Sequence, residues 1–234
     1  MSQCRRGFVQ TDEKEFNEES ILLLRRAQKD ILYLLEQGYR IKPASTFVGN
    51  HYMLSERQRI AVVRATAEKE LLALRERKRL DRPGAQQQVF IDGFNVIITL
   101  EVALSNSTLI RCMDKTVRDL AGLRGTYRII DKTEEAIRLI GEEFKLLGCK
   151  EAIFYLDAPV SNSGRLKQKL QEGLERYPFQ TKIELVDNPD VILQRLGNVI
   201  TQDAIILNQC ESWINLTAEI ISSRFPDLRI VELD

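Results

Sequence analysis

The stretch Val89-Phe-Ile-Asp-Gly-Phe-Asn95 decides the fold of the chain. Its first three residues are β-branched or aromatic, which is typical of a buried strand. Asp92 ends that strand, and turn chemistry alone explains a glycine at position 93 and an asparagine at position 95. From residue 89 to residue 234, further short apolar runs alternate with helical patterns. This alternation predicts an α/β domain with a parallel sheet and flanking helices.

The same patterns place the individual elements of this domain. Strands are predicted at residues 88–91, 108–112, 152–156, 182–186, 198–201 and 228–232. Helices are predicted at residues 97–104, 133–147, 163–176, 189–195 and 213–224. Residues 113–128 form a long insert between two of these elements, and we expect a glycine-containing loop there. In open parallel sheets, binding sites lie beyond the carboxyl ends of the strands.

Residues 1–84 are predicted to form a helical unit ahead of the α/β domain at residues 85–234. The charged segment at residues 75–84 ends in Pro-Gly and is the expected linker. Because a few helices bury little apolar surface on their own, this unit should pack on the second domain or join copies of the chain into a homo-oligomer.

The helical unit is predicted to contain two main helices. Apolar residues recur at helical spacing between Glu18 and Gly38, where the glycine is a plausible stop. Residues 42–52 look irregular. Ser55-Glu-Arg-Gln58 then has the form of a capping box, which opens a helix that should run to Arg79.

Composition and length place the chain among globular proteins. Hydrophobic residues make up 44% and charged residues 29% of its 234 residues. No apolar run approaches the ~20 residues needed to span a bilayer, and no secretory signal is recognisable at the N-terminus. The four cysteines are scattered without a C-x-x-C pair, so neither zinc binding nor disulfides are expected. We therefore expect a cytoplasmic protein without a membrane partner.

Charge is unevenly distributed along the chain, although the formal net charge is zero. Residues 1–88 hold 17 Lys and Arg against 12 Asp and Glu, whereas residues 89–234 hold 17 against 22. This asymmetry fits a basic part that lies near a nucleic acid and an acidic part that needs cations. Two ordinary solvated surfaces explain it equally well.

Aspartates end or follow several of the predicted strands. They are Asp92, Asp157, Asp190 and Asp203. In a parallel sheet these carboxylates would converge on one edge, where their repulsion would raise their pKa values. Mg²⁺ or Mn²⁺ would relieve that repulsion through oxygen ligands, and such a site suits phosphodiester hydrolysis. Each aspartate alone is equally well explained by a turn or a helix N-cap, and Asp190 could cap the helix that follows it, so the repetition is what favours a site.

Ile91-Asp-Gly-Phe-Asn-Val96 resembles the opening motif of the PIN-like ribonucleases of the NYN type, in which a strand ends in Asp-Gly-x-Asn. Asn188-Pro-Asp-Val-Ile-Leu193 and Val199-Ile-Thr-Gln-Asp-Ala-Ile-Ile206 are similar to two later acidic segments of that family. The resemblance covers residues 88–234, and a helical extension precedes them. It implies a PIN-like fold and a metal-dependent acidic site that cleaves RNA.

Roles for individual residues follow from this resemblance. It implies that Asp92, Asp190 and Asp203 hold Mg²⁺ or Mn²⁺, with Asp157 as a fourth ligand or a supporting carboxylate. Asn95 would orient a ligand or the scissile phosphate. The last motif carries one acidic residue, Asp203, where the family often has more.

The insert at residues 113–128 is not a common feature of that family. It adds two candidate acidic residues, Asp114 and Asp119, and Tyr127, which could stack on a base. Guanidinium groups, hydroxyls and helix starts bind phosphates, so contacts with a nucleic acid are expected from Arg118, Arg124, Arg128, Ser161 and Ser163. The competing interpretation is a surface loop with local ion pairs and a helix cap that binds nothing.

The sequence thus predicts a metal-dependent phosphodiesterase, most simply a ribonuclease with RNA as its partner. The alternative is a PIN-like domain whose eroded site binds RNA or a protein without catalysis, and metal binding discriminates between the two. An aspartyl-phosphate phosphatase is disfavoured because Phe94 stands where that chemistry needs a second acid. His51, the sole histidine, has no visible partner for general-base catalysis.

Overall fold

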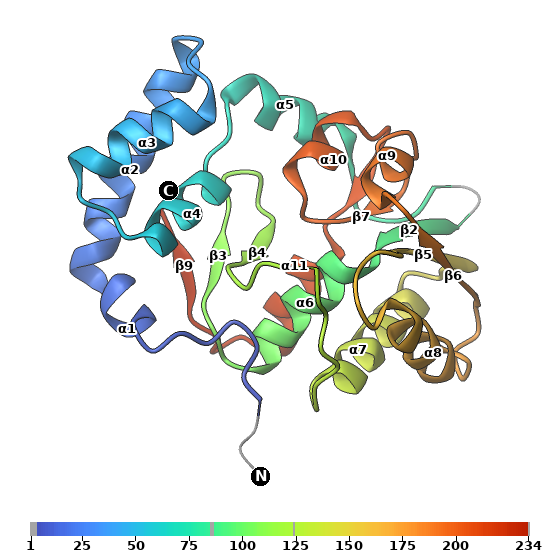
Figure 1. Cartoon of the computed structure of the whole chain (residues 1–234). Helices are drawn as coiled ribbons and strands as arrows, with labels where there is room; N and C mark the ends of the chain where they lie inside the picture. The colour runs from blue at the N-terminus through green and yellow to red at the C-terminus, as the bar shows by residue number, and fades with distance from the viewer. Residues whose placement is uncertain (1–3, 85–86, 124, 234) are drawn as a thin grey trace.

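The larger sheet of the computed structural model, which we call the central sheet, is parallel, and its strands β7, β2, β5 and β6 lie on the right of Figure 1. The structure describes residues 4–84, 87–123 and 125–233. The six strands of the central sheet run in the order β1-β8-β7-β2-β5-β6, and every neighbouring pair is parallel. They are β1 Arg79–Leu80, β2 Gln88–Asp92, β5 Glu151–Asp157, β6 Gln180–Val186, β7 Val199–Ile200 and β8 Trp213–Ile214. The α/β fold with a parallel sheet and flanking helices, predicted from the sequence, is confirmed.

Helices cover both faces of this sheet. Val89 and Ile91 of β2 are fully buried on one face, whereas Phe90 points to the other and packs against a smaller cluster. The first face packs against α6 Gly93–Leu104, α7 Thr133–Leu146, α8 Ser163–Leu174 and α11 Leu216–Arg224. The second packs against α9 Pro189–Leu193 and α10 Ala204–Gln209.

Two of the predicted strands lie outside the central sheet. β3 Leu109–Arg111 and β9 Ile230–Glu232 pair in parallel with each other, and β4 Val117–Asp119 pairs antiparallel with β3. β4 falls in the insert that the sequence predicts as a loop, and Lys115 makes the tight turn before it with a φ of 66°. The expectation of one sheet is wrong for these segments, because pairing between strands so far apart in sequence leaves no local pattern.

The N-terminal region is helical, as predicted, but its helices differ from those expected. They are α1 Asp12–Glu15, α2 Glu18–Glu36, α3 Ile41–His51, α4 Glu56–Ala65 and α5 Lys69–Lys78. α2 is the helix predicted after Glu18. The stretch predicted to be irregular is α3, and Pro43 lies in its first turn, where proline is tolerated.

The helix predicted from Ser55 to Arg79 is two helices, α4 and α5. The capping box at Ser55 is confirmed, with both reciprocal hydrogen bonds present. α4 ends where Thr66 adopts extended backbone and donates its hydroxyl to the carbonyl of Val62 at 2.7 Å. Such a bond back to the preceding turn offers the backbone an alternative to further helix.

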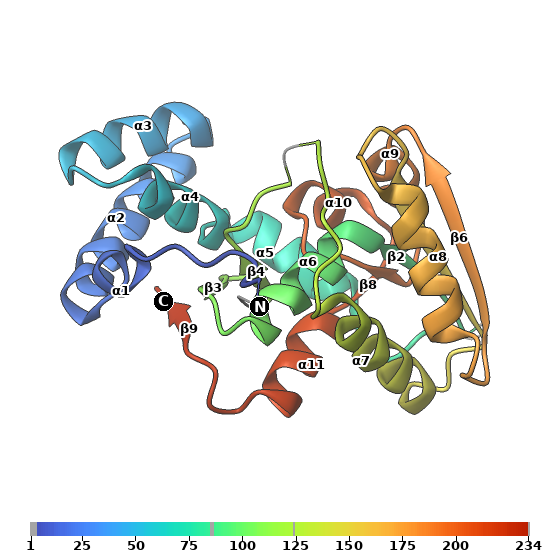
Figure 2. The same ribbon diagram turned by 60° about the horizontal axis from the view of Figure 1, so that its bottom comes forward.

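The N-terminal helices pack on the small sheet formed by β3, β4 and β9 (Figure 2). Leu24 of α2 and Val62 of α4 are buried in one cluster with Ile110 of β3 and Val231 of β9. The helical unit therefore completes its core with strands from the rest of the chain. In addition, β1 lies within the expected linker and pairs with β8. A domain boundary at residue 84 stays a prediction.

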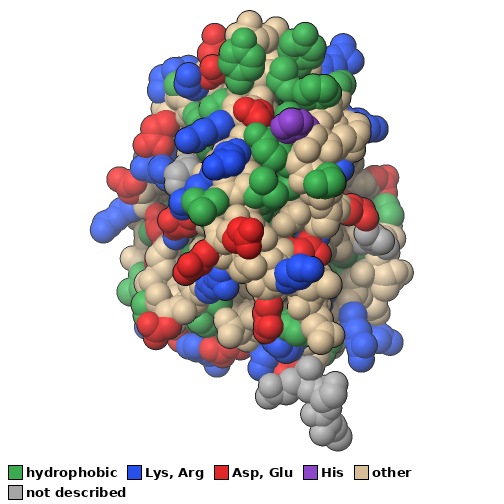
Figure 3. Space-filling view, turned by 90° about the vertical axis from the view of Figure 1, so that its left-hand side faces the viewer, with side chains coloured by type: hydrophobic (Ala, Val, Ile, Leu, Met, Phe, Trp, Pro, Cys, Tyr) green, Lys and Arg blue, Asp and Glu red, His purple; other side chains and the backbone are tan. Residues whose placement is uncertain are grey.

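The outward side of the N-terminal helices exposes large apolar side chains, namely Leu22, Tyr33, Tyr39, Phe47 and Met53. Figure 3 shows this side, where green hydrophobic side chains gather in the upper part of the view around the purple histidine. His51 is exposed and contacts Tyr52 edge-on. A homo-oligomer formed through this surface stays a prediction, which analytical ultracentrifugation would test. Among the described residues, no helix is both long and apolar enough to cross a membrane.

Candidate active site

Four aspartates reach one cavity at the carboxyl end of the central sheet. β7, β2, β5 and β6 are consecutive neighbours in that sheet. Asp92 ends β2 and Asp157 ends β5, while Asp190 and Asp203 follow β6 and β7. All four line a single cavity of about 590 Å³, which we call the aspartate cavity. The strand order therefore brings together carboxylates that lie far apart in the sequence.

Asp92 is the buried member of this set. It occupies the N-cap position of α6, yet its side chain caps nothing. Its Oδ2 instead accepts a hydrogen bond from the Thr201 hydroxyl at 2.8 Å, and no Lys or Arg of the described residues forms an ion pair with it. Burial raises the pKa of Asp92 to about 7; the Thr201 bond works against this, and the three other aspartates add to it. A buried carboxylate without a counter-charge is costly unless a ligand supplies one.

The other three aspartates differ in how their side chains are used. Oδ1 of Asp203 caps α10 by accepting from two backbone N–H groups, at 2.7 and 3.1 Å. Asp190 is exposed in the first turn of α9, and Asn188 caps that helix, so the capping role considered for Asp190 is wrong. Burial raises the pKa of Asp157, and burial followed by the charges of Asp203 and Asp157 raises that of Asp190.

A polar network fixes the loop between β7 and α10. Asn95 Oδ1 accepts from the backbone N–H of Gln202 at 2.7 Å, and the Thr201 hydroxyl oxygen accepts from the N–H of Asp203 at 3.0 Å. Because the oxygen of Asn95 is used in this way, its Nδ2 is the group left to face a ligand in the cavity. An N–H donor suits a phosphate oxygen better than a metal ion. Gln202 Oε1 is buried beside the cavity and has no hydrogen-bond partner in the part of the chain that the structure describes.

Basic groups line the cavity on the side of the N-terminal helices. Arg64 of α4 and Arg118 of β4 are among its lining residues, together with Asp119. Arg118 Nε donates to the carbonyl of Gln202 at 2.7 Å and so supports the loop that carries Asp203. Asp119 is already engaged, because its two oxygens accept from the Thr99 hydroxyl and from a backbone N–H, both at 2.8 Å.

Asp114 lies behind this wall and does not line the cavity. Its Oδ2 accepts from Arg75 Nη1 and Arg118 Nη2, each at 2.6 Å, and its Oδ1 accepts from the hydroxyl and N–H of Thr116 at 2.6 and 3.1 Å. Burial opposes ionisation of Asp114, but Arg118, Thr116 and Arg75 outweigh it and lower its pKa. Asp114 and Arg118 therefore belong to a buried ion cluster. The competing interpretation of local ion pairs holds for them, but its surface position is wrong, and a phosphate contact by Arg118 stays a prediction.

Three other predicted nucleic-acid contacts, Arg128, Ser161 and Ser163, do not line the aspartate cavity. Arg128 is exposed and lines a neighbouring hollow. Ser161 is exposed, and Ser163 is buried with its hydroxyl 3.4 Å from the carbonyl oxygen of Ala158. Arg124 lies outside the described residues.

Tyr127 is fully buried, so its predicted stacking on a base is wrong. Its hydroxyl donates to Glu101 Oε1 at 2.6 Å. Glu101, itself fully buried, also forms an ion pair with Arg6 of the N-terminal arm, which we define as residues 4–9. The Arg6 guanidinium lies over the Tyr127 ring, 4.8 Å from its centroid. These contacts hold the N-terminal arm against α6.

Three residues of the site were not assigned from the sequence, namely Thr201, which supports Asp92 from behind the cavity, and the lining residues Gln202 and Arg64. Thr201 had a signal, because it is the threonine of the segment that ends in Asp203. Gln202 and Arg64 had none, since one acts through a backbone bond and the other comes from a separate helix.

The donors of the cavity fit a hydrated hard cation. Among the described residues, no three His, Cys, Asp or Glu side chains lie close enough to coordinate one ion together. Mg²⁺ needs less than this, because it keeps several waters and binds through one or two carboxylates plus phosphate oxygens. The lining supplies carboxylate and amide oxygens, including the unpartnered Gln202 Oε1, and contains no histidine or cysteine.

Comparisons with known proteins give the chain a family. Residues 84–219 match the family described as "Domain of unknown function (DUF5616)". The chain belongs to the DUF5616 family. Residues 23–78 match a second description, "Protein of unknown function (DUF434)". The chain is also similar to "Uncharacterized protein MJ0935" of Methanocaldococcus jannaschii, with 32% identity over 201 residues that cover 85% of this chain and 96% of that protein. No solved structure matches the chain.

These matches divide the aspartate cavity between two regions. The DUF5616 match contains all four aspartates together with Asn95 and Arg118. The DUF434 match contains Arg64 and Thr66, which line the opposite side. The cavity of this DUF5616 protein therefore takes its final form only when both regions are packed together.

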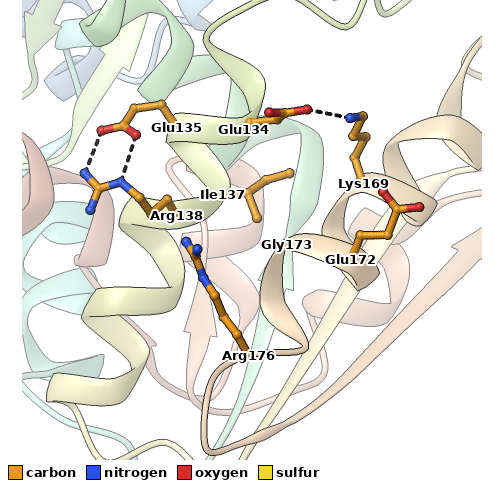
Figure 4. Close-up of a pocket in the computed structure, with 8 residues that line it drawn as sticks. All are labelled: Glu134, Glu135, Ile137, Arg138, Lys169, Glu172, Gly173 and Arg176. Carbon is orange, nitrogen blue, oxygen red and sulfur yellow. Dashed lines mark hydrogen bonds and ion pairs between the residues drawn. The ribbon is translucent and has the colours of Figure 1, made fainter.

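A second hollow of the DUF5616 region lies between α7 and α8 and measures about 400 Å³ (Figure 4). The Arg138 guanidinium pairs with Glu135 on its own helix, and Lys169 pairs with Glu134 across the gap at 2.5 Å. Because these charges neutralise one another at the surface, we place the candidate site of the DUF5616 domain at the aspartate cavity.

Gly93 is required by close packing in the DUF5616 domain, and the turn chemistry proposed for it is wrong. It begins α6, where a Cβ atom would lie 2.5 Å from Leu156 Cδ2 and 3.1 Å from the Tyr155 carbonyl oxygen. The Gly93→Ala variant is expected to lose about 1–3 kcal/mol of unfolding free energy, as overpacked cores do. Urea denaturation measures this loss. Gly164→Ala is the control, because a Cβ there meets open space in α8, and equal effects of the two changes would contradict the explanation.

Proposed function

We propose that the chain is a divalent-metal-dependent phosphodiesterase that cleaves RNA, with a PIN-like domain of the NYN type behind an N-terminal helical region. One observation carries the proposal. The buried Asp92 has no counter-charge and faces a cavity that three further aspartates line from adjacent strand ends. Structural roles explain a capping Asp203, but they do not explain a carboxylate buried at this cost.

The residues of the cavity suggest a division of labour. Mg²⁺ or Mn²⁺ bound there would lower the pKa of a coordinated water and neutralise charge on phosphate oxygens. Asp92, Asp190 and Asp203 would hold the ion, one or two of them directly and the rest through its bound waters, and Asp157 would be a further ligand of this kind or support them. Asn95 would donate from Nδ2 to a non-bridging phosphate oxygen while water attacks the phosphorus opposite the leaving oxygen.

Thr201 would be a positioning residue. Its hydroxyl donates to Asp92 and accepts from the N–H of Asp203, so it fixes the two carboxylates relative to each other. Arg118 would act in the same sense, through its bond to the carbonyl of Gln202.

A second candidate function has an observation of its own. The described carboxylates are too far apart for direct coordination of one ion by three of them. This spacing favours a domain that has kept the fold and binds RNA or a protein without cleaving it. The two candidates differ in metal binding, because a binding module needs no cation at Asp92.

Cleavage of labelled RNA in Mn²⁺ tests the proposed function. The Asp92→Asn and Asp203→Asn variants are expected to cleave about 100-fold more slowly than wild type, or slower still, and to lose the heat of Mn²⁺ binding in calorimetry. Asp187→Asn is the matched control, because Asp187 is exposed in the loop between β6 and α9 and does not line the cavity. RNA binding without Mn²⁺ binding or cleavage would support the second candidate instead.

The cytoplasmic location predicted from the sequence is also a proposal. Cys112, Cys149 and Cys210 are buried free thiols, which suits a reducing compartment. Localisation of a tagged chain in cells would test it.

A further inference from the structure

Another hollow adjoins the aspartate cavity, and its charged lining side chains are positive where those of the aspartate cavity are mostly negative. It measures about 430 Å³ and lies between the N-terminal arm, α4 and the segments 120–122 and 128–130. Its charged lining residues are Arg6, Arg57, Arg64 and Arg128, and no Asp or Glu is among them. We call it the arginine groove. Arg64 and Gly122 line both hollows, so the two are adjacent.

The four arginines differ in what they can still bind. Arg57 is fully engaged, with bonds to the Asp12 carboxylate and to two backbone carbonyls. Arg6 is tied to the buried Glu101. Arg64 Nη1 donates to the backbone carbonyl of Asp119 and lies 3.7 Å from a carboxylate oxygen of the same residue, and the Arg64 side chain is 35% exposed.

Arg128 is the open member of the set. It is exposed, and among the described residues no hydrogen bond or ion pair involves its guanidinium. Its backbone carbonyl accepts from Arg6, which fixes the base of the side chain. Arg64 and Arg128 therefore offer N–H donors to an incoming anion. Arg6 and Arg57 are used in contacts within the protein and stabilise the sides of the groove.

Apolar side chains accompany these arginines. Phe8, Val9 and Ile60 line the groove and are exposed to 45%, 37% and 37%. An exposed aromatic ring beside guanidinium groups is the combination on which bases stack while phosphates bind. The Arg5 guanidinium already lies over the Phe8 ring, 3.8 Å from its centroid, and the 45% exposure of Phe8 leaves the rest of the ring open to a base.

We propose that the arginine groove binds phosphates and a base of a single-stranded polynucleotide next to the bond that the aspartate cavity cleaves. The path of the polynucleotide from the groove into the cavity rests on the proposed function. A polyanion that enters a cavity lined by four carboxylates is repelled, and the adjoining guanidinium groups offset that repulsion. A hollow of about 430 Å³ is within the ~300–1,000 Å³ range of small-ligand pockets, so it admits on the order of one nucleotide and excludes a duplex.

Fluorescence anisotropy with a labelled 12-nucleotide RNA in EDTA tests the groove without cleavage. Arg128→Glu is expected to weaken binding by about tenfold and to reduce the slope of affinity against salt by about 1. Phe8→Ala should weaken binding without changing that slope. Arg77→Glu is the matched control, since Arg77 is exposed on α5 and lines neither hollow. The same measurement is made with single-stranded DNA of the same sequence and with an RNA duplex.

The outcomes separate the groove from the proposed function. Equal affinity of Arg128→Glu and wild type, or tighter binding of the duplex than of the single strand, would overturn the groove even if RNA is cleaved. Binding that depends on Arg128, with no cleavage by wild type in Mn²⁺, would leave the groove standing and overturn the proposed function. Circular dichroism melting checks that Arg128→Glu is folded, which its exposed side chain favours.

Discussion

In metal-free buffer, the Asp92→Asn variant is expected to be more stable than wild type at pH 8 and to lose more than half of that advantage at pH 5. The reason is the pKa of Asp92, which burial raises from 3.8 to about 7 in the folded protein. Between these two values the folded chain keeps a proton that the unfolded chain has already lost. The contribution of Asp92 to stability is therefore full below pH 4, falls as the pH rises through 7, and is lost above it.

The size of this effect is on the order of 4 kcal/mol at pH 8, at ~1.36 kcal/mol for each pKa unit. Asparagine cannot ionise, and its side-chain oxygen can still accept from the Thr201 hydroxyl. Urea denaturation at several pH values between 5 and 9 in EDTA measures the difference. Asp157 and Asp190 change in the same direction, so part of the pH dependence should remain in the variant.

Two controls sharpen this experiment. Asp187→Asn should follow the wild-type curve at every pH, because Asp187 is exposed and does not line the cavity. Adding Mn²⁺ at pH 8 should stabilise wild type, since a cation supplies the missing counter-charge, and should do little for Asp92→Asn. Parallel pH curves for Asp92→Asn and wild type would contradict the assignment of Asp92 as a buried carboxylate without a partner.

Asp114→Ala is expected to lose about 3–5 kcal/mol of unfolding free energy, because it removes the one carboxylate that two buried arginines share. Arg75 and Arg118 are only 2% and 8% exposed. Without Asp114 each would retain a positive charge in the interior, and Arg118 would lose the contact that directs it to the carbonyl of Gln202. Urea denaturation measures the loss.

The exposed ion pair between Lys69 and Glu36 provides the comparison for Asp114. Its Lys69 side chain is 74% exposed, and pairs of this kind contribute roughly 0–1 kcal/mol. Glu36→Ala should therefore leave the unfolding free energy within about 1 kcal/mol of wild type. A similarly small loss in Asp114→Ala would show that the arginines find water or other acceptors, and would contradict the role assigned to the cluster.

The central sheet could be predicted where its strands carry a local pattern. β2, β5 and β6 are five to seven residues long and are bounded by turn residues. β8 has two residues, Trp213 and Ile214. It was assigned to a helix because two residues are too few to show the alternation of a strand. α10 was missed for the same reason, since its six residues are too few to show a helical face. The pairing of β3 with β9 depends on contacts that no local pattern records.

The candidate site could be predicted where acidic residues stand at or just after the ends of predicted strands. Asp92, Asp157, Asp190 and Asp203 were identified in this way, and the order of their strands accounts for their convergence. Arg64 could not be identified, because it reaches the cavity through the packing of α4 beside β4. The opposite error concerns Asp114 and Tyr127. Their place in the insert suggested exposed side chains, but both are buried and form hydrogen bonds inside the protein.

β9 imposes an order on the folding of the chain during synthesis. Arg229, next to β9, donates to the carbonyl of Phe16, a residue 213 positions earlier. Val231 and Leu233 fill the same apolar cluster as Leu24 of α2. On a nascent chain the N-terminal helices leave the ribosome long before the apolar residues of β9 that complete their core. The N-terminal helices therefore stay incompletely packed until translation has passed residue 233, and their apolar surface is open to chaperones for that time.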